Sequence, residues 1–238
     1  MHRAASVLLL PIVPLRTPHR RALVAGGTGR VGAAIAERLR ADGWSVLAAG
    51  RADGDLRTRD GAIALVAKAL DELGGLDLVV HSAGDGFVPK AIEDVTEQDW
   101  DDALDVTAKG TFFLAQAAAD ALRASNGVLV IVEDVASHQA WTSFPAHSAA
   151  KAAQAMLTRV LARALAPDAR VVGIAPGPVA VEPGQEERRA AETLLGRVGS
   201  PQDVADAVVY LAGADYVTGT TLVVDGGRML KSGGRGAP

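Results

Sequence analysis

The stretch Ala25-Gly26-Gly27-Thr28-Gly29-Arg30-Val31-Gly32 decides how this 238-residue chain folds. It follows an apolar run of strand length at residues 22–25 and opens a helical pattern that continues to about residue 40. Glycines let the backbone turn tightly and approach a pyrophosphate closely, while the helix N-terminus offers N–H donors and the positive end of its dipole. A strand, a glycine-rich turn and a helix in this order predict a dinucleotide-binding turn, with a plain tight turn as the alternative.

Arg30 stands in the first turn of this helix, where a cation opposes the helix dipole. A bound anion beside Arg30 would offset that penalty, whereas a side chain that points into water would need no ligand. We expect Arg30 to lie near the cofactor phosphates.

Strand-length apolar runs alternate with helical patterns along the rest of the chain, which is typical of a parallel sheet with crossover helices. The expected strands are residues 22–25, 45–49, 76–81, 128–132, 171–175 and 222–224, with one further short strand inside residues 51–56. Besides the helix after the glycine turn, the expected helices begin near residue 61 and cover residues 98–124, 144–166 and 201–212. The prediction is an α/β fold, a single doubly wound Rossmann domain in three α/β/α layers, at residues 21–230.

Composition excludes several classes of protein. The net charge of −4 comes without a basic stripe, so nucleic acid is not expected as a partner. The chain has no cysteine, which excludes disulfides, thiol chemistry and zinc–thiolate sites, and we expect no metal. Residues 1–20 are interpreted as a disordered or misassigned extension, with a targeting segment as the alternative, and residues 231–238 as a flexible tail. No stretch fits a membrane span, and the expected location is the cytoplasm.

The order of several motifs resembles the short-chain dehydrogenase/reductase family along residues 21–228. The motifs are the glycine turn, Asp55-Leu56, His81-Ser82-Ala83-Gly84, His147 with Lys151, Ala175-Pro176-Gly177-Pro178-Val179, Arg197-Val198-Gly199-Ser200-Pro201, and Val223-Val224-Asp225-Gly226-Gly227. The glycine spacing alone also fits the longer sugar-nucleotide-modifying members, but the short C-terminal part matches the single-domain reductases. The resemblance implies an oxidoreductase with a small-molecule substrate. It also implies a homodimer or homotetramer, formed through the two long helices.

The resemblance also implies a cofactor site. It places cofactor contacts at Gly26, Thr28, Gly29, Arg30, Val31, Gly32, Arg51, Asp55, Leu56, Ser82, Ala83, Gly84, Lys151, Pro176, Gly177 and Val179. Gly50 occupies the position of the acidic residue that would bind the ribose 2′-hydroxyl of NAD, and Arg51 follows it. An arginine there favours the 2′-phosphate of NADP, so NADP is expected rather than NAD. An ordinary solvated loop residue is the alternative for Arg51.

Three positions depart from the family's catalytic pattern. His147 replaces the tyrosine that donates the proton, Asp134 replaces the serine thirteen residues earlier, and Thr107 replaces the helix asparagine. Lys151 keeps its place four residues after His147, on the same helix face. The pteridine reductases of this family also have an aspartate at the serine position and an arginine in the glycine turn, so Asp134 and Arg30 make this chain resemble them. The replacement of the tyrosine by His147 does not fit that subgroup.

The altered site leaves two functions open. An imidazole can donate a proton near neutral pH, and Asp134 would pair with it, so Asp134, His147, Lys151 and Thr107 are the candidate catalytic residues of an NADP-dependent reductase. A pterin or another small compound with a C=O or C=N bond would be the substrate. The alternative is a non-catalytic nucleotide-binding homologue that acts as a sensor or a partner subunit. In that case Asp134 caps the following turn and Thr107 bonds its own backbone. Residues 180–195 are either a mobile lid or a solvated helix face.

Overall fold

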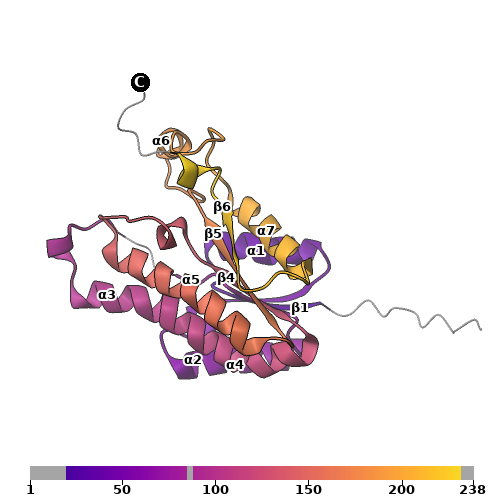
Figure 1. The fold of residues 1–238 in the computed structure, drawn as a ribbon. Helices are drawn as coiled ribbons and strands as arrows, with labels where there is room; N and C mark the ends of the chain where they lie inside the picture. The colour runs from indigo at the N-terminus through magenta and orange to yellow at the C-terminus, as the bar shows by residue number, and fades with distance from the viewer. Residues whose placement is uncertain (1–19, 85–87, 232–238) are drawn as a thin grey trace, which may run out of the picture.

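Six parallel strands form one sheet in the order β2-β1-β3-β4-β5-β6 in the computed structural model, which describes residues 20–84 and 88–231 (Figure 1). The strands are β1 (Arg21–Ala25), β2 (Ser45–Ala49), β3 (Leu78–His81), β4 (Val128–Val132), β5 (Arg170–Pro176) and β6 (Thr221–Val224). The strand order reverses between β1 and β3, and ligands of such sheets bind at the carboxyl ends of the strands at this point. The predicted α/β Rossmann-type fold is confirmed.

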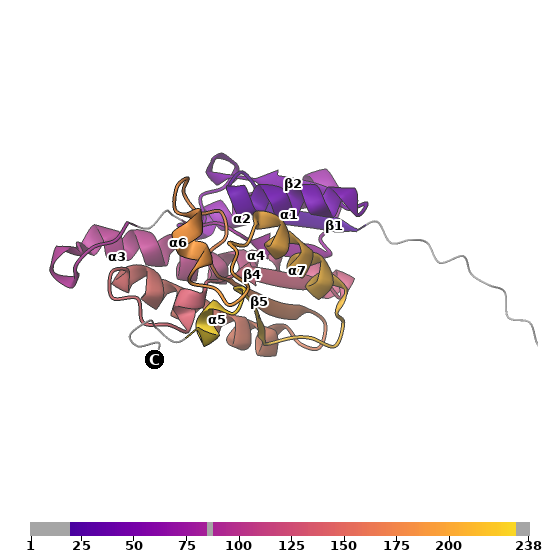
Figure 2. The ribbon, with the colours of Figure 1, turned by 90° about the horizontal axis from the view of Figure 1, so that it is seen from above.

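Helices cover both faces of the sheet, as Figures 1 and 2 show. The helices are α1 (Arg30–Ala41), α2 (Arg59–Leu73), α3 (Glu97–Leu104), α4 (Gly110–Ser125), α5 (Pro145–Leu165), α6 (Glu186–Ala190) and α7 (Pro201–Gly213). One apolar core lies between the sheet and α2, α4 and α5, and a second lies between the sheet and α1 and α7. All residues of β3 and β4 are buried, as strands covered on both faces should be.

The short strand predicted inside residues 51–56 does not form, and this prediction was wrong. Residues Arg51–Asp53 make a 3₁₀ turn, η1, and β2 is the edge strand of the sheet. The Asp53 carboxylate accepts a hydrogen bond from the Gly50 N–H at 2.9 Å, and the Asp53 N–H donates to the Gly50 carbonyl at 3.1 Å. These local bonds close the segment into a turn, and Leu56 is buried only two residues before the cap of α2. Too few residues remain for an extended strand.

The predicted helix at residues 98–124 is interrupted where it passes the sheet. A π-helical segment, η3 (Asp105–Lys109), separates α3 from α4, and Thr107 lies in its middle. The Thr107 carbonyl accepts a hydrogen bond from the Thr111 hydroxyl at 2.7 Å. Such π segments are rare and often lie at functional sites. Apart from this break, the predicted helix limits agree closely with the structure.

The predictions for residues 1–20 and 231–238 fall outside the described residues, except at Arg20 and Lys231. The Arg20 guanidinium lies 5.5 Å from the ring centroid of Trp44, and the Lys231 ammonium donates to the Thr193 carbonyl at 3.2 Å. Within residues 20–84 and 88–231, no helix has the length and apolar character needed to cross a membrane.

Candidate active site

A cavity of about 200 Å³ lies at the carboxyl ends of β1 and β3, where the strand order reverses. The predicted cofactor residues that line it are Gly26, Thr28, Gly29, Arg51, Asp55, Leu56, Ser82, Ala83 and Gly84. The lining also includes Gly50, Gly54, Leu65 and Val106, which were not predicted as cofactor contacts. Residues from five separate chain segments thus meet at the place where the glycine turn predicted a nucleotide.

The glycine turn is packed too closely for side chains. Gly26 has φ +81°, and a Cβ there would lie 2.5 Å from the Ala83 backbone nitrogen. A Cβ on Gly32 would lie 2.1 Å from the Gly26 carbonyl oxygen. By contrast, a Cβ on Gly29 would meet only the Gly26 oxygen, at 3.5 Å, so the space before the N-terminus of α1 is open. Exposed N–H donors behind a side-chain-free turn fit the pyrophosphate of a dinucleotide.

Arg30 points away from this turn. Its guanidinium donates to the Glu182 carboxylate at 2.8 Å and to the Val181 carbonyl at 3.3 Å, and both charged side chains are exposed. Arg30 therefore links the first turn of α1 to the segment that follows β5. In this arrangement it does not line the cavity.

A side chain at position 50 would crowd Thr28. A Cβ on Gly50 would lie 2.9 Å from the Thr28 hydroxyl oxygen, so a larger residue would displace Thr28 from the cavity wall. Arg51 starts η1 beside this position and lines the same cavity.

Two nearby carboxylates are engaged by basic side chains. The Asp53 carboxylate lies 2.5 Å from the Lys68 ammonium, and the Asp55 carboxylate lies 2.6 Å from the Arg57 guanidinium. The hydrogen bond from Lys68 lowers the pKa of Asp53, and the one from Arg57 lowers the pKa of Asp55. Both carboxylates therefore stay ionised, and the charge of Arg51 also helps to lower the pKa of Asp55.

Asp134 and His147 come together beyond β4. The Asp134 Oδ2 atom lies 3.7 Å from the His147 Nε2 atom, and the two side chains are only 19% and 12% exposed. Asp134 also caps η4 (Val135–Ser137), because its Oδ1 atom accepts from the Ala136 N–H at 2.7 Å. The predicted capping role of Asp134 is thus present, and its second carboxylate oxygen faces His147 without a hydrogen bond. The Trp141 ring stacks on the imidazole, with ring centroids 6.3 Å apart and planes 18° apart.

Lys151 is buried one turn further along α5. Its ammonium donates to the Val132 carbonyl at 3.0 Å and to the Gln154 amide oxygen at 2.9 Å. Burial lowers the pKa of Lys151, while the charges of Asp134 and Glu133 oppose this shift. The two carboxylates therefore help to keep Lys151 protonated.

Comparison with known proteins identifies the family. A family model described as enoyl-(acyl carrier protein) reductase matches residues 30–228. The chain is 37% identical to 2-dehydro-3-deoxy-D-gluconate 5-dehydrogenase of Escherichia coli over 190 residues, 74% of this chain and 75% of that protein. It is 34% identical to 3beta-hydroxysteroid dehydrogenase 1 of Eggerthella lenta over 246 residues, 89% of this chain and 94% of that protein. This chain belongs to the short-chain dehydrogenase/reductase family.

A solved structure of this family agrees with the fold. An apo SCOR enzyme from Clostridium thermocellum matches with a TM-score of 0.83 at 25% identity, over 91% of this chain and 96% of that one. The predicted family and the general oxidoreductase class are thus confirmed, and the family implies a nicotinamide cofactor.

Three predicted residues of this reductase-family chain lie at the end of β5 and do not line the cavity. Pro176 ends the strand, and the Gly177 N–H donates to the Val224 carbonyl at 3.0 Å, which ties the turn to β6. Val179 forms an isolated bridge with Gly199. Their positions border the segment of residues 180–195. Thr107 is 4% exposed, and its backbone carbonyl accepts a hydrogen bond from the Thr111 hydroxyl.

A buried polar cluster behind Lys151 was missed from the sequence. The Gln154 amide nitrogen donates to the Thr111 hydroxyl at 2.9 Å and lies 3.3 Å from the His81 Nδ1 atom. Burial, and secondarily the charge of Lys151, lowers the pKa of His81 to about 3, so this imidazole is neutral. Gln154 stands three residues after Lys151, and this helical spacing was a usable signal.

Glu133 is the second residue that the sequence interpretation missed. Its carboxylate is 2% exposed and accepts hydrogen bonds from the hydroxyls of Thr158 at 2.6 Å and Thr221 at 3.0 Å. A Cβ on Gly173 would lie 2.1 Å from its Oε1 atom, so the neighbouring strand leaves room for it. Burial raises the pKa of Glu133, although the hydroxyl donors oppose the shift. A carboxylate directly after an apolar strand was the available signal.

Replacement of Glu133 by glutamine is expected to stabilise the protein, and its advantage over wild type should grow as pH rises. Burial raises the pKa of Glu133, so the folded state holds this proton more tightly than the unfolded chain does. The stability linked to the proton is complete below the unfolded pKa and is lost as pH rises through the folded pKa. Glutamine keeps an acceptor for Thr158 and carries no charge. The Tm values of Glu133→Gln and wild type should differ least near pH 4. Near pH 8 the free energy of unfolding of the variant should be higher by about 1 kcal/mol, which corresponds to a Tm higher by roughly 2–4 °C. Glu93→Gln, at an exposed position, is the control, and parallel curves for Glu133→Gln and wild type would contradict the prediction.

Proposed function

We propose that this chain is an NADP-dependent reductase that transfers hydride to a small substrate with a C=O or C=N bond, a pterin-like ring among the candidates. The observation that carries the proposal is the Asp134–His147 pair at 3.7 Å, one helical turn from Lys151. A carboxylate beside an imidazole is an arrangement suited to proton transfer near neutral pH.

The chain's own residues would divide the work as follows. When bound, the nicotinamide supplies the hydride that reduces the substrate carbon. Residues 26–32 would hold the pyrophosphate and Lys151 the ribose. His147 would donate an imidazole N–H proton to the substrate oxygen or nitrogen, and Asp134, which faces the Nε2 atom, would stabilise the imidazolium before the transfer. Solvent would then restore the proton on the imidazole.

The short reach of histidine bears on the substrate. An imidazole nitrogen extends less far from the helix than a tyrosine hydroxyl, and a misplacement of about 1 Å can cost roughly a hundredfold in rate. The ring nitrogens of a pterin-like substrate could instead exchange protons with Asp134 or with water. This argument supports the resemblance to the pteridine reductases at Arg30 and Asp134.

The NADP preference is proposed from Gly50, where the Cβ of any side chain would lie 2.9 Å from the Thr28 hydroxyl oxygen, and from Arg51 in the cavity wall. Arg51→Ala is expected to raise the KM for NADPH about 10-fold, because a charge-assisted contact to a phosphate is lost. The KM for NADH should stay within about 2-fold in the same variant. Initial rates with both cofactors measure this, and an equal effect on the two would oppose the assignment.

A non-catalytic nucleotide-binding homologue is the second candidate. The observation that favours it is the joint replacement at Thr107, Asp134 and His147 of three residues on which the resembled family relies. In that case the cavity would bind NADPH as a signal or for assembly with a partner.

Turnover with a labelled cofactor separates the two candidates. NADPH carrying deuterium at the transferable position is incubated with dihydropterins, quinones and simple carbonyl compounds. A product with one deuterium on the reduced carbon supports the reductase. Tight NADPH binding with no labelled product across the panel supports the non-catalytic homologue.

The remaining assignments are also proposals. We propose one domain at residues 21–230, cytoplasmic location, and a homodimer or homotetramer formed through α4 and α5. These helices expose Phe112, Met156 and Val160, whose surfaces are 40%, 53% and 52% accessible.

A further inference from the structure

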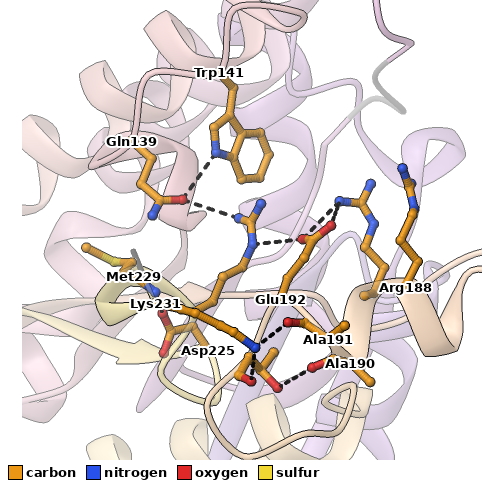
Figure 3. Close-up of polar contacts among 12 residues, drawn as sticks. Gln139, Trp141, Arg188, Ala190, Ala191, Glu192, Asp225, Met229 and Lys231 are labelled. Carbon is orange, nitrogen blue, oxygen red and sulfur yellow. Dashed lines mark hydrogen bonds and ion pairs between the residues drawn. The ribbon is translucent and has the colours of Figure 1, made fainter. Parts of the chain in front are cut away.

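Three side chains from distant parts of the chain form one cluster, and Figure 3 shows two of them, Trp141 and Glu192, around a central guanidinium. This guanidinium belongs to Arg228, whose Cζ atom lies 4.7 Å from the Trp141 ring centroid. Trp141 in turn stacks on His147. A cation therefore lies one aromatic ring away from the proposed proton donor.

This cluster carries an excess of positive charge. The Glu192 carboxylate accepts from the Arg228 Nε atom at 3.1 Å and from the Arg189 Nη1 atom at 3.0 Å. Two guanidinium groups thus share one carboxylate. The Arg228 side chain is only 18% exposed, and partial removal from water strengthens the interaction of its charge with a ligand.

Arg228 has donor groups to spare. Its Nη1 atom reaches the Gln139 amide oxygen only at 3.4 Å, a distance beyond the usual range of such bonds. Its Nη2 atom makes no hydrogen bond with the residues that the structure describes. The edge formed by two guanidinium nitrogens matches the two oxygens of a carboxylate.

The turn that carries Arg228 is held in place. The Asp225 carboxylate accepts hydrogen bonds from the N–H groups of Gly227 and Met229, both at 2.7 Å, and fixes η5 (Arg228–Leu230). Gly227 has φ +80°, a conformation that favours glycine. Arg228 is therefore presented from an ordered turn, and its hydrogen bond to Glu192 ties that turn to the segment of residues 180–195.

We infer that Arg228 binds a carboxylate of the substrate, and that the substrate is an oxo acid, a small carbonyl compound with a separate carboxylate group. The inference rests on the proposed reductase function and names the substrate class of that site. Glu192 is the internal counter-ion that the substrate carboxylate displaces from Arg228. The carbonyl then lies toward His147, on the other side of Trp141.

Paired substrates test this inference. The probes are 5-oxohexanoate and its neutral amide, which share the carbonyl and differ in charge. In Arg228→Met, the KM for the acid should rise about 10- to 100-fold, the range expected for loss of a charge-assisted contact, and the KM for the amide should stay within about 2-fold. In Glu192→Gln, which removes the competing carboxylate, the KM for the acid should fall. Arg189→Met is the matched control, because it removes a guanidinium from the same carboxylate but not the one beside Trp141.

A binding measurement separates failure of the inference from failure of the proposed function. Calorimetric titration of NADP⁺-loaded protein with hexanoate, which cannot be reduced, should show binding that Arg228→Met abolishes and Arg189→Met retains. This result supports the inference even if no carbonyl compound is turned over. The inference is overturned if hexanoate does not bind, or if it binds Arg228→Met as well as it binds wild type. It is also overturned if Arg228→Met changes the KM for the acid and the KM for the amide equally, because Arg228 would then only support Trp141. Melting curves verify that each variant is folded.

Discussion

Replacement of His147 by alanine is expected to lower kcat by about 10²- to 10⁴-fold, the usual contribution of a positioned general acid. The His147 side chain is 12% exposed and lies 3.7 Å from the Asp134 carboxylate. The dissociation constant for NADPH should stay within about 2-fold, because His147 does not line the cavity that holds the predicted cofactor contacts. Single-turnover rates and fluorescence titration with NADPH measure the two effects separately.

Asp134→Asn is the matched variant. The amide oxygen can still accept the capping bond from the Ala136 N–H, so the turn after β4 is kept while the charge beside His147 is lost. A decrease in kcat of about 10-fold, smaller than for His147→Ala, is expected if Asp134 acts only through the imidazole. If His147→Ala keeps wild-type kcat while Asp134→Asn loses it, the proton comes from Asp134 or from water, and the role given to His147 is wrong.

The fold could be predicted because its signals are local. Strands β2 and β4 match their predicted limits, since each is a short apolar run between polar or turn residues. The missing strand at residues 51–56 shows where this fails: the side chain of Asp53 closes η1 through the Gly50 N–H, and hydropathy does not register such bonds. The π segment at Thr107 was not predicted either, because helical sequence continues on both sides of it.

The candidate site could be predicted where spacing along one element defines it. His147, Lys151 and the glycine turn belong to this class, because each is set by a single helix or turn. Arg228 and Trp141 could not be found this way. They meet only after the end of β6 folds back beside the loop that precedes α5, and no spacing in the sequence encodes that contact. The ion pair between Arg30 and Glu182 is of the same kind, since it joins segments 152 positions apart.

Replacement of Gly32 by alanine is expected to weaken NADPH binding by about 100-fold or more and to destabilise the protein. The new Cβ would lie 2.1 Å from the Gly26 carbonyl oxygen, and both atoms belong to the tightly packed turn, so the backbone must move. Overpacking of this kind costs about 1–3 kcal/mol, and the Tm should fall by roughly 2–4 °C per kcal/mol. Fluorescence titration and thermal melts with and without NADPH measure both effects.

Gly29→Ala separates loss of the cofactor site from loss of the fold. A Cβ at this position makes only one ordinary contact, 3.5 Å from the Gly26 oxygen, and Gly29 has φ −79°, which alanine adopts without strain. The Tm without cofactor should therefore match wild type. Yet Gly29 lines the cavity before the N-terminus of α1, so an added methyl group should weaken NADPH binding about 10-fold by opposing close approach of the pyrophosphate. Wild-type affinity in both glycine variants would show that the pyrophosphate does not lie on this turn, and the cofactor site would have to be placed elsewhere on the sheet edge.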